Sequence, residues 1–265
     1  MSDLLLVETH DHVELWTLNR PDALNSFNKG LLLALNEQLE RLEGASGEDL
    51  PRAIILSGAG ERSFSAGADL KERKTMPPPE VPVFVSLIGS TMTRIAECRV
   101  PVIAAIHGFA FGGGMEAALA CDLRVVGPAA KMGLTETRLG IVPGAGGTQR
   151  LPRLVGTGKA KSLILTGRRI DADEAYRLGV AEFRAEEPGR EATVAKALEV
   201  AAEIALCGPV GVRAAKDAID GGFDMPMDEA LLHERNCYDR TLGTEDRLEA
   251  LAAFAEKRPP VFKGR

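Results

Sequence analysis

The stretch "VPVIAAIHGFAFGGGMEAALACD", residues 100–122, sets an apolar run, three consecutive glycines and an alanine-rich segment in direct succession. The apolar run is typical of a buried strand, and the segment from Gly113 is typical of a helix. A helix that begins at Gly113 directs its unpaired N–H groups and the positive end of its dipole outward. Glu116 follows three residues later, near the same helix face. The stretch therefore predicts a strand–helix unit that can stabilise a negatively charged oxygen beside a carboxylate.

The glycine run also fits a dinucleotide-binding motif. Gly112, Gly114 and Ala117 match G-x-G-x-x-[GA], and Glu136 lies 19 residues beyond Ala117, about where a ribose-binding acid belongs. Against this interpretation, the residues "HGFAF" separate the strand from the glycines, and the charge of Glu116 would repel a pyrophosphate. The motif also sits in mid-chain rather than in a first βαβ unit. Glycines that merely permit close packing would not call for the carboxylate.

A second loop and a second acid complete the predicted site. The loop "SFSAGADL", residues 63–70, could supply another backbone N–H beside a glycine, at Ala66. Two such donors on one carbonyl oxygen would stabilise an enolate. Glu136 lies in an apolar setting, where burial and a neighbouring carboxylate both raise a carboxyl pKa. A lone Glu is usually a solvated surface residue, but a pair whose pKa values are separated suits one base and one acid.

The order of elements indicates an α/β core followed by helices. We expect a core over residues 1–190 and a helical region for oligomerisation over residues 191–265, because no strand-like sequence follows the stretch 179–185. Residues 59–79 are expected to form a loop that Pro77 to Pro79 keep from being helical. Within the core, the strand-like runs are 4–10, 12–19, 52–58, 100–106 and 122–126, and the helix-like runs are 29–44, 83–97 and 113–121.

Composition excludes several functional classes. The chain has 265 residues, and its net charge of -6 gives no support to bulk nucleic-acid binding. Its 4 cysteines are far apart and form no disulfide framework. His10 and His12 lack a third and fourth ligand nearby, so no metal site is predicted. No apolar run approaches the length of about 18 residues that suggests a membrane span. The N-terminus lacks a basic leader, which favours a cytoplasmic protein or, in a eukaryote, one whose leader was removed.

Several motifs together resemble the crotonase family, the enoyl-CoA hydratases and isomerases. They are "RPDALNSF", "FSAGADLKE", "PVIAAIHGFAFGGGMEAALACDLRV", "ETRLGIVPGAGGTQRLPRLVG", "LTGRRIDADEA" and "DRLEALAAFAEKRPP", and they span nearly the whole chain. The resemblance implies an α/β fold, a spiral of ββα units. It also implies a C-terminal helical region that builds homotrimers, often paired into hexamers.

The resemblance also implies a chemistry. Ala66 and Gly113 match the two N–H donors to the thioester carbonyl. Glu116 matches the acid that holds and activates water, and Glu136 matches the acid that protonates the α-carbon. Keeping both acids favours hydration of a short-chain 2-enoyl-CoA over double-bond isomerisation. The implied reaction needs no metal or redox cofactor, since coenzyme A is part of the substrate.

The resemblance places the acyl-CoA substrate along two loops and a distant helix. Lys71 could equally be a solvated loop lysine. Phe254 and Lys257, which the family places across a subunit boundary, could equally serve helix packing and surface charge. The matching positions are Ala23, Leu24, Asn25, Ala66, Gly67, Ala68, Asp69, Leu70, Lys71, Gly112, Gly113, Phe254 and Lys257.

Within the family, one branch looks most similar, the 3-methylglutaconyl-CoA hydratases of leucine breakdown, also known as AU-rich RNA-binding proteins. A substrate with a far carboxylate would need a cation in its pocket, and Arg73 in "LKERK" is a candidate, although it could also be a solvated loop cation. RNA binding in that branch is linked to a lysine-rich first helix. Residues 29–44 carry Glu37, Glu40 and Glu43 against Lys29 and Arg41, so no nucleic-acid partner is expected.

Overall fold

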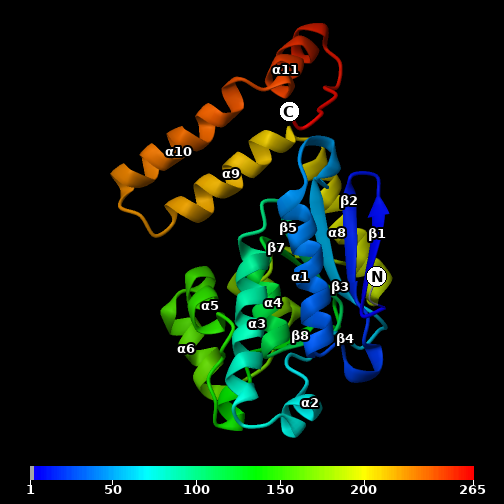
Figure 1. Cartoon of the computed structure of the whole chain (residues 1–265), viewed down its shortest axis with the longest axis vertical. Coiled ribbons are helices and arrows are strands. Elements are labelled where there is room, and N and C mark those ends of the chain that lie inside the picture. Colours follow the sequence, from blue (N-terminus) through cyan, green and yellow to red (C-terminus); the bar gives the residue numbers. More distant parts are fainter. Residues whose placement is uncertain (1–2) are drawn as a thin grey trace.

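Two β-sheets and the helices around them make up the structure, a computed structural model that describes residues 3–265 (Figure 1). In the larger sheet only the first pair of strands is antiparallel. Its strands in spatial order are β1 (Leu5–His10), β2 (Val13–Leu18), β3 (Ala53–Gly58), β5 (Val102–Ile106), β7 (Leu123–Val126) and β10 (Phe183–Arg184). Those of the smaller sheet are β4 (Ser63–Ser65), β6 (Phe109–Phe111), β8 (Lys131–Gly133) and β9 (Ile170–Asp171).

The chain advances as a spiral. Each of the pairs β3–β4, β5–β6 and β7–β8 gives one strand to the larger sheet and the next to the smaller sheet, and a helical segment follows. Successive strands within each sheet are parallel neighbours. This is the predicted spiral of ββα units. It does not fit a dinucleotide-binding unit, because β6 intervenes between β5 and the helix that the glycines open.

Helices cover the sheets and extend beyond them. The described helices are η1 (Pro21–Ala23), α1 (Lys29–Gly44), η2 (Gly47–Asp49), α2 (Leu70–Thr75), α3 (Glu80–Ala96), α4 (Gly113–Ala120), η3 (Glu136–Leu139), α5 (Gly147–Val155), α6 (Thr157–Thr166), α7 (Ala172–Leu178), α8 (Arg190–Ala205), α9 (Pro209–Gly222), α10 (Met227–Leu242) and α11 (Glu245–Glu256). None of them combines the length and the apolarity needed to cross a membrane.

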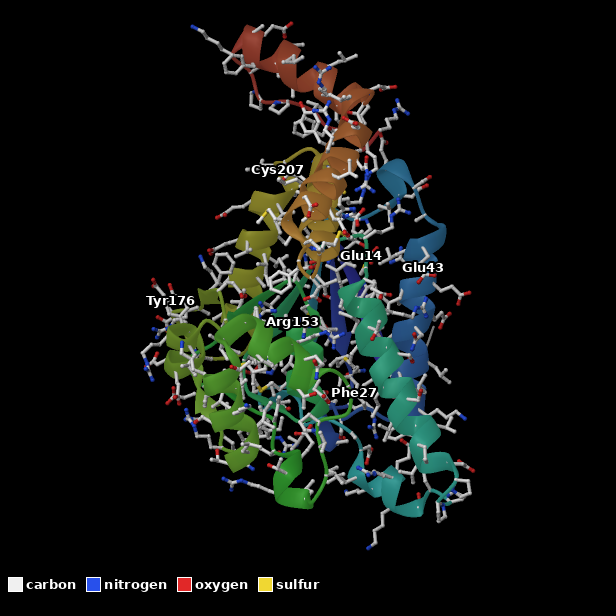
Figure 2. All side chains as sticks on the ribbon, turned by 90° about the vertical axis from the view of Figure 1, so that its left-hand side faces the viewer. Glu14, Phe27, Glu43, Arg153, Tyr176 and Cys207 are labelled. Carbon is white, nitrogen blue, oxygen red and sulfur yellow. The ribbon has the colours of Figure 1, made fainter. Side chains whose placement is uncertain are left out.

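The local predictions for the N-terminal part are confirmed. β1 and β2 form a hairpin whose turn contains Asp11 at φ 51°. Asn28 caps α1, since its side chain accepts a hydrogen bond from the N–H of Leu31 at 2.9 Å. The buried face of α1 packs on the larger core, which also contains the fully buried Phe27 (Figure 2). Leucines at helical spacing therefore act here as the sequence pattern indicates.

Two boundaries differ from the expected ones. The predicted loop 59–79 contains strand β4 and helix α2, because Asp69 caps α2 by accepting from the N–H groups of Lys71 and Glu72 at 3.0 and 3.2 Å. The prolines begin only after that helix has ended. The expected core boundary at residue 190 is also wrong, since α8 packs on β2, β3, β5 and β7. The core therefore extends through residue 205, and α9–α11 form the helical region beyond it (Figure 1).

Candidate active site

The start of α4 packs against the loop that follows β4, and glycines make this contact possible. A Cβ on Gly114 would lie 2.0 Å from the carbonyl oxygen of Ser65, and one on Gly67 would lie 2.8 Å from the nitrogen of Gly113. Gly67 also has φ +89°, in the region that favours glycine. Gly112 precedes the helix at φ 52°. The first N–H of α4, that of Gly113, therefore lies directly beside the residue 65–69 loop.

The N–H group available beside Gly113 is that of Ala68, and not that of Ala66 as the sequence suggested. The N–H of Ala66 donates to the carbonyl of Leu24 at 3.0 Å, so it is already engaged. The N–H of Asp69 is likewise engaged, with the carbonyl of Phe27. Ala68 N–H makes no hydrogen bond within the described residues 3–265, and its nitrogen lies 3.5 Å from the position of a Cβ on Gly113.

The reason for this correction is the register of the loop. Phe27 and Ala68 form an isolated parallel β-bridge, in which Phe27 bonds the residues on either side of Ala68. Alternate residues of an extended segment point their N–H groups to opposite sides. The N–H of Ala68 therefore faces away from Phe27 and toward the start of α4. Sequence alone shows the loop but not which of its neighbours sets that register.

Glu116 is held by backbone donors. Only 3% of the residue is exposed, and its Oε1 accepts from the N–H groups of Ala145 at 2.7 Å and Gly147 at 2.9 Å. Burial raises the pKa of this carboxyl, while the two N–H bonds and the nearby Arg150 guanidinium act in the opposite direction. Hydrogen bonds to the ionised form stabilise it, so the donors favour a carboxylate that can accept a proton.

Glu136 has a different environment. It begins η3, is 9% exposed, and its Oε2 has no hydrogen-bond partner within the described chain. Its Oε1 lies 3.1 Å from the position of a Cβ on Gly112, the first of the three consecutive glycines. Its pKa is raised to about 7: burial is the largest cause, a backbone hydrogen bond opposes it, and the charge of Glu116 adds to it. Glu136 can therefore carry a proton near neutral pH, while Glu116 is favoured as the base.

Arg150 is a positioning residue that the sequence analysis missed. It lies in α5, and its Nη1 donates to the carbonyl oxygen of Ala145 at 2.8 Å. The N–H of the same Ala145 donates to Glu116. Arg150 thus fixes the turn that fixes the carboxylate. In the sequence, the arginine one turn after the glycines of "PGAGGTQR" indicates a cation near this turn. Only the fold shows that its guanidinium donates to the carbonyl of Ala145.

The predicted substrate-binding loops are positioned by their own side chains. Asn25 is fully buried and bonds Arg20 N at 3.0 Å, Ala59 O at 2.9 Å and Ser63 O at 2.8 Å. Asp69 accepts from the guanidinium of Arg20 at 2.9 Å and caps α2. These two side chains therefore hold the loops together, which leaves the backbone of the loops to face a substrate.

The remaining substrate-binding candidates fall into two groups. Ala23 and Leu24 are half-buried in the first loop, and Leu70 and Lys71 are exposed on α2. Phe254 is 87% exposed on α11, and Lys257 is also exposed and ends that helix. Figure 1 places α11 at the opposite end of the molecule from α2. One chain therefore does not bring Phe254 and Lys257 to its own site, and any such contact requires a second copy.

The whole chain is similar to known proteins. A family model described as enoyl-CoA hydratase/isomerase matches residues 8–265. The mouse protein named methylglutaconyl-CoA hydratase, mitochondrial, is 46% identical over 248 residues, which cover 93% of this chain and 78% of that protein. The mouse enoyl-CoA hydratase domain-containing protein 2, mitochondrial, is 44% identical over 249 residues, or 94% of this chain and 83% of that protein. A crystal structure of an enoyl-CoA hydratase from Bacillus anthracis is similar with a TM-score of 0.94 at 46% identity, covering 99% of this chain and 100% of that chain.

The raised pKa of Glu136 predicts a pH-dependent effect on stability. An acid whose pKa rises on folding from 4.5 to about 7 makes the protein lose stability as pH rises through that window. Glu136→Gln removes this loss. Between pH 5 and pH 8 the variant should gain stability relative to the parent by on the order of 2 kcal/mol, measured by urea unfolding. The same stability difference at both pH values would contradict the prediction, and Glu48→Gln, at an exposed carboxylate, is the control.

Proposed function

The chain belongs to the enoyl-CoA hydratase/isomerase family and is an enzyme of that type, and from this premise we propose that it is an enoyl-CoA hydratase, a hydro-lyase. It adds water across the 2,3-double bond of a short-chain 2-enoyl-CoA. The observation that carries the proposal is the pair of buried carboxylates, Glu116 and Glu136, beside the N–H groups of Ala68 and Gly113. We propose that it acts in the cytoplasm, in fatty-acid β-oxidation or leucine degradation.

The geometry supports a stepwise assignment of roles. Ala68 and Gly113 donate to the thioester oxygen and stabilise the negative charge that develops there. Glu116 takes a proton from the water as its oxygen bonds the β-carbon, and the electron pair of the double bond moves onto the thioester oxygen. Glu136 then gives its proton to the α-carbon. Base, acid and oxyanion donors all come from the chain, so we propose that hydration uses no metal or redox cofactor.

Two other functions are less well supported. An isomerase that shifts a double bond needs only one acid, whereas here two buried carboxylates flank the donors. An RNA-binding role would need an unpaired basic surface on α1. There, Arg41 forms an ion pair with Glu14, and Glu43 forms one with Arg94 of α3. We therefore propose acyl-CoA, and no nucleic acid, as the ligand.

Replacing either carboxylate by an amide should slow catalysis far more than it weakens substrate binding. Glu116→Gln and Glu136→Gln should each lower kcat for hydration of crotonyl-CoA by roughly 10²-fold or more, the scale of lost acid–base catalysis, while KM changes far less. Steady-state kinetics on the folded variants test this. If either variant kept near-parental hydration, the role given to that residue would be wrong.

Arg150 should affect the pH profile through Glu116. Removing its charge raises the pKa of Glu116, so Arg150→Gln should move the acidic limb of the kcat profile to higher pH and lower kcat by about tenfold. Arg150→Lys keeps the charge and should recover part of the loss. Arg153→Gln, one turn further along α5 (Figure 2), is the control and should leave the profile in place. An unshifted profile for Arg150→Gln would limit its role to packing.

A specific observation favours a narrower substrate, 3-methylglutaconyl-CoA. A cavity of about 430 Å³ lies between α2 and the segment after Glu136, and its lining is Leu70, Arg73, Lys74, Val81, Leu139 and Ile141. Neither cation forms an ion pair with a described residue. An apolar pocket with unpaired cations suits a short acyl group that ends in a carboxylate. The cavity also lies next to the donor loop, since Leu70 follows Asp69 directly.

Substrate preference distinguishes the general from the narrower function. Under the narrower function, Arg73→Gln should lower kcat/KM for 3-methylglutaconyl-CoA by about tenfold, a loss of about 1.4 kcal/mol, and leave crotonyl-CoA unaffected. Lys159→Gln, at an exposed lysine of α6, is the charge control. A parental preference of tenfold or more for crotonyl-CoA would exclude the specialised enzyme and leave the general hydratase.

We further propose that the enzyme is a homotrimer or a dimer of trimers. The α9–α11 region exposes large apolar side chains, including Ile219 at 68%, Met227 at 74% and Phe254 at 87%. Among the described residues of α10, only Cys237 is buried. Such a surface favours association with another copy. Light scattering at micromolar concentration should give a trimer or hexamer mass, and a monomer mass would refute the assembly.

A further inference from the structure

Three side chains with metal-ligating atoms lie together between α9 and α10, in the helical region that follows the spiral. Asp217 comes from α9, and His233 and Cys237 come from α10. His233 Nε2 lies 3.6 Å from Cys237 Sγ and 3.9 Å from Asp217 Oδ1. All three ligand atoms lie within 4.8 Å of one another. The set contains one thiol, one imidazole and one carboxylate, which is a donor combination suited to zinc.

The distances are close to those of a tetrahedral zinc site. Zinc bonds of about 2.0 Å to nitrogen and about 2.3 Å to sulfur place those two atoms about 3.5 Å apart. The observed separation of His233 Nε2 and Cys237 Sγ is 3.6 Å. Their spacing of four residues puts both on one face of α10. Asp217 Oδ1 lies 3.9 Å from His233 Nε2, about half an ångström beyond the separation that two zinc bonds of about 2.0 Å give, so the carboxylate must move toward the ion on binding.

The surroundings leave room for the imidazole and orient the carboxylate. A Cβ on Gly221 would lie 2.5 Å from His233 Nε2, so a glycine at this point of α9 clears the space for the ring. Asp217 Oδ2 accepts from Arg240 Nη2 at 2.7 Å, which leaves Oδ1 directed to the cluster. An outer partner of this kind fixes a ligating carboxylate. The cluster thus has a supporting contact as well as ligands.

The site is accessible to an ion. Asp217, Gly221 and Arg240 border a cavity of about 950 Å³ that lies between α9 and the end of α4 and the side of α5. The cavity borders the Asp217 side of the cluster and gives space there for a water as fourth ligand. His233 Nε2 lies 3.0 Å from the backbone oxygen of Asp217, and a zinc ion bound at this nitrogen would replace that hydrogen bond.

We propose that Asp217, His233 and Cys237 bind one zinc ion that ties α9 to α10. Binding forms a zinc–sulfur bond, and the thiol proton of Cys237 passes to solvent. Because ligands must be deprotonated, affinity falls in acid. The ion fixes the two helices that carry much of the exposed apolar surface. No short sequence motif indicates this site, because the ligand from α9 is 16 residues before the first ligand from α10.

The test is metal titration of the full-length chain after removal of metal with a chelator. Co²⁺, which reports a thiolate ligand by an absorption band, should bind with one equivalent per chain, and Zn²⁺ should displace it. Cys237→Ser should abolish the band, and His233→Asn should weaken binding at least tenfold. The control is Cys207→Ser, at an exposed cysteine near the junction of α8 and α9 (Figure 2), which should bind as the parent does.

Melting temperature gives a second, independent readout. Saturating Zn²⁺ should raise the Tm of the parent and of Cys207→Ser, but not of Cys237→Ser. If Cys237→Ser does not fold, Asp217→Asn, at an exposed carboxylate, takes its place: it should weaken Co²⁺ binding at least tenfold and reduce the rise in Tm with Zn²⁺. A band that persists in Cys237→Ser, or that disappears in Cys207→Ser, would overturn the proposal. So would absence of binding at micromolar metal. Hydration rates play no part in this test, so its outcome is independent of the proposed enzymatic function.

Discussion

The bonds that Glu116 Oε1 accepts from the N–H groups of Ala145 and Gly147 are the constraint on which the site depends. A buried carboxylate without donors would be costly to keep ionised. Here the donors come from the turn between η3 and α5, so the base on one helix is fixed by the start of another. Arg150 extends the network by holding the carbonyl of Ala145. The position of the base is therefore a property of two turns of the spiral, not of α4 alone.

The same arrangement separates the two acids chemically. Glu116 is surrounded by N–H groups and a guanidinium that favour its charge, whereas Glu136 has an oxygen without a hydrogen-bond partner within residues 3–265. The charge of Glu116 then adds to the effect of burial on Glu136. The charge of Glu116 thus helps to keep Glu136 protonated. One buried carboxylate supports a neighbouring acid at neutral pH, which a pair of exposed glutamates could not do.

Periodicity and glycine placement predicted much of this fold. The β1–β2 hairpin, α1 with its Asn28 cap, and the strand–glycine–helix unit at α4 are confirmed, because each depends on local patterns. The predictions were wrong where a residue distant in the sequence sets the local structure. Ala68 rather than Ala66 faces α4 because Phe27 sets the loop register. The packing of α8 on the sheet is likewise non-local, since its helical pattern is the same as that of the helices beyond it.

The candidate reacting groups and two of the candidate substrate-binding residues lie at different ends of the molecule. Glu116, Glu136 and the donor loops lie within the spiral, and their contacts are all made inside it. Phe254 and Lys257 lie on α11, which projects beyond the body in both views (Figures 1 and 2). A rigid spiral can hold the acids without help, because their supports are backbone groups of the same spiral. Under the proposed function the CoA part of the substrate extends past that framework, and the proposed assembly would bring Phe254 and Lys257 of a second copy near its distal end.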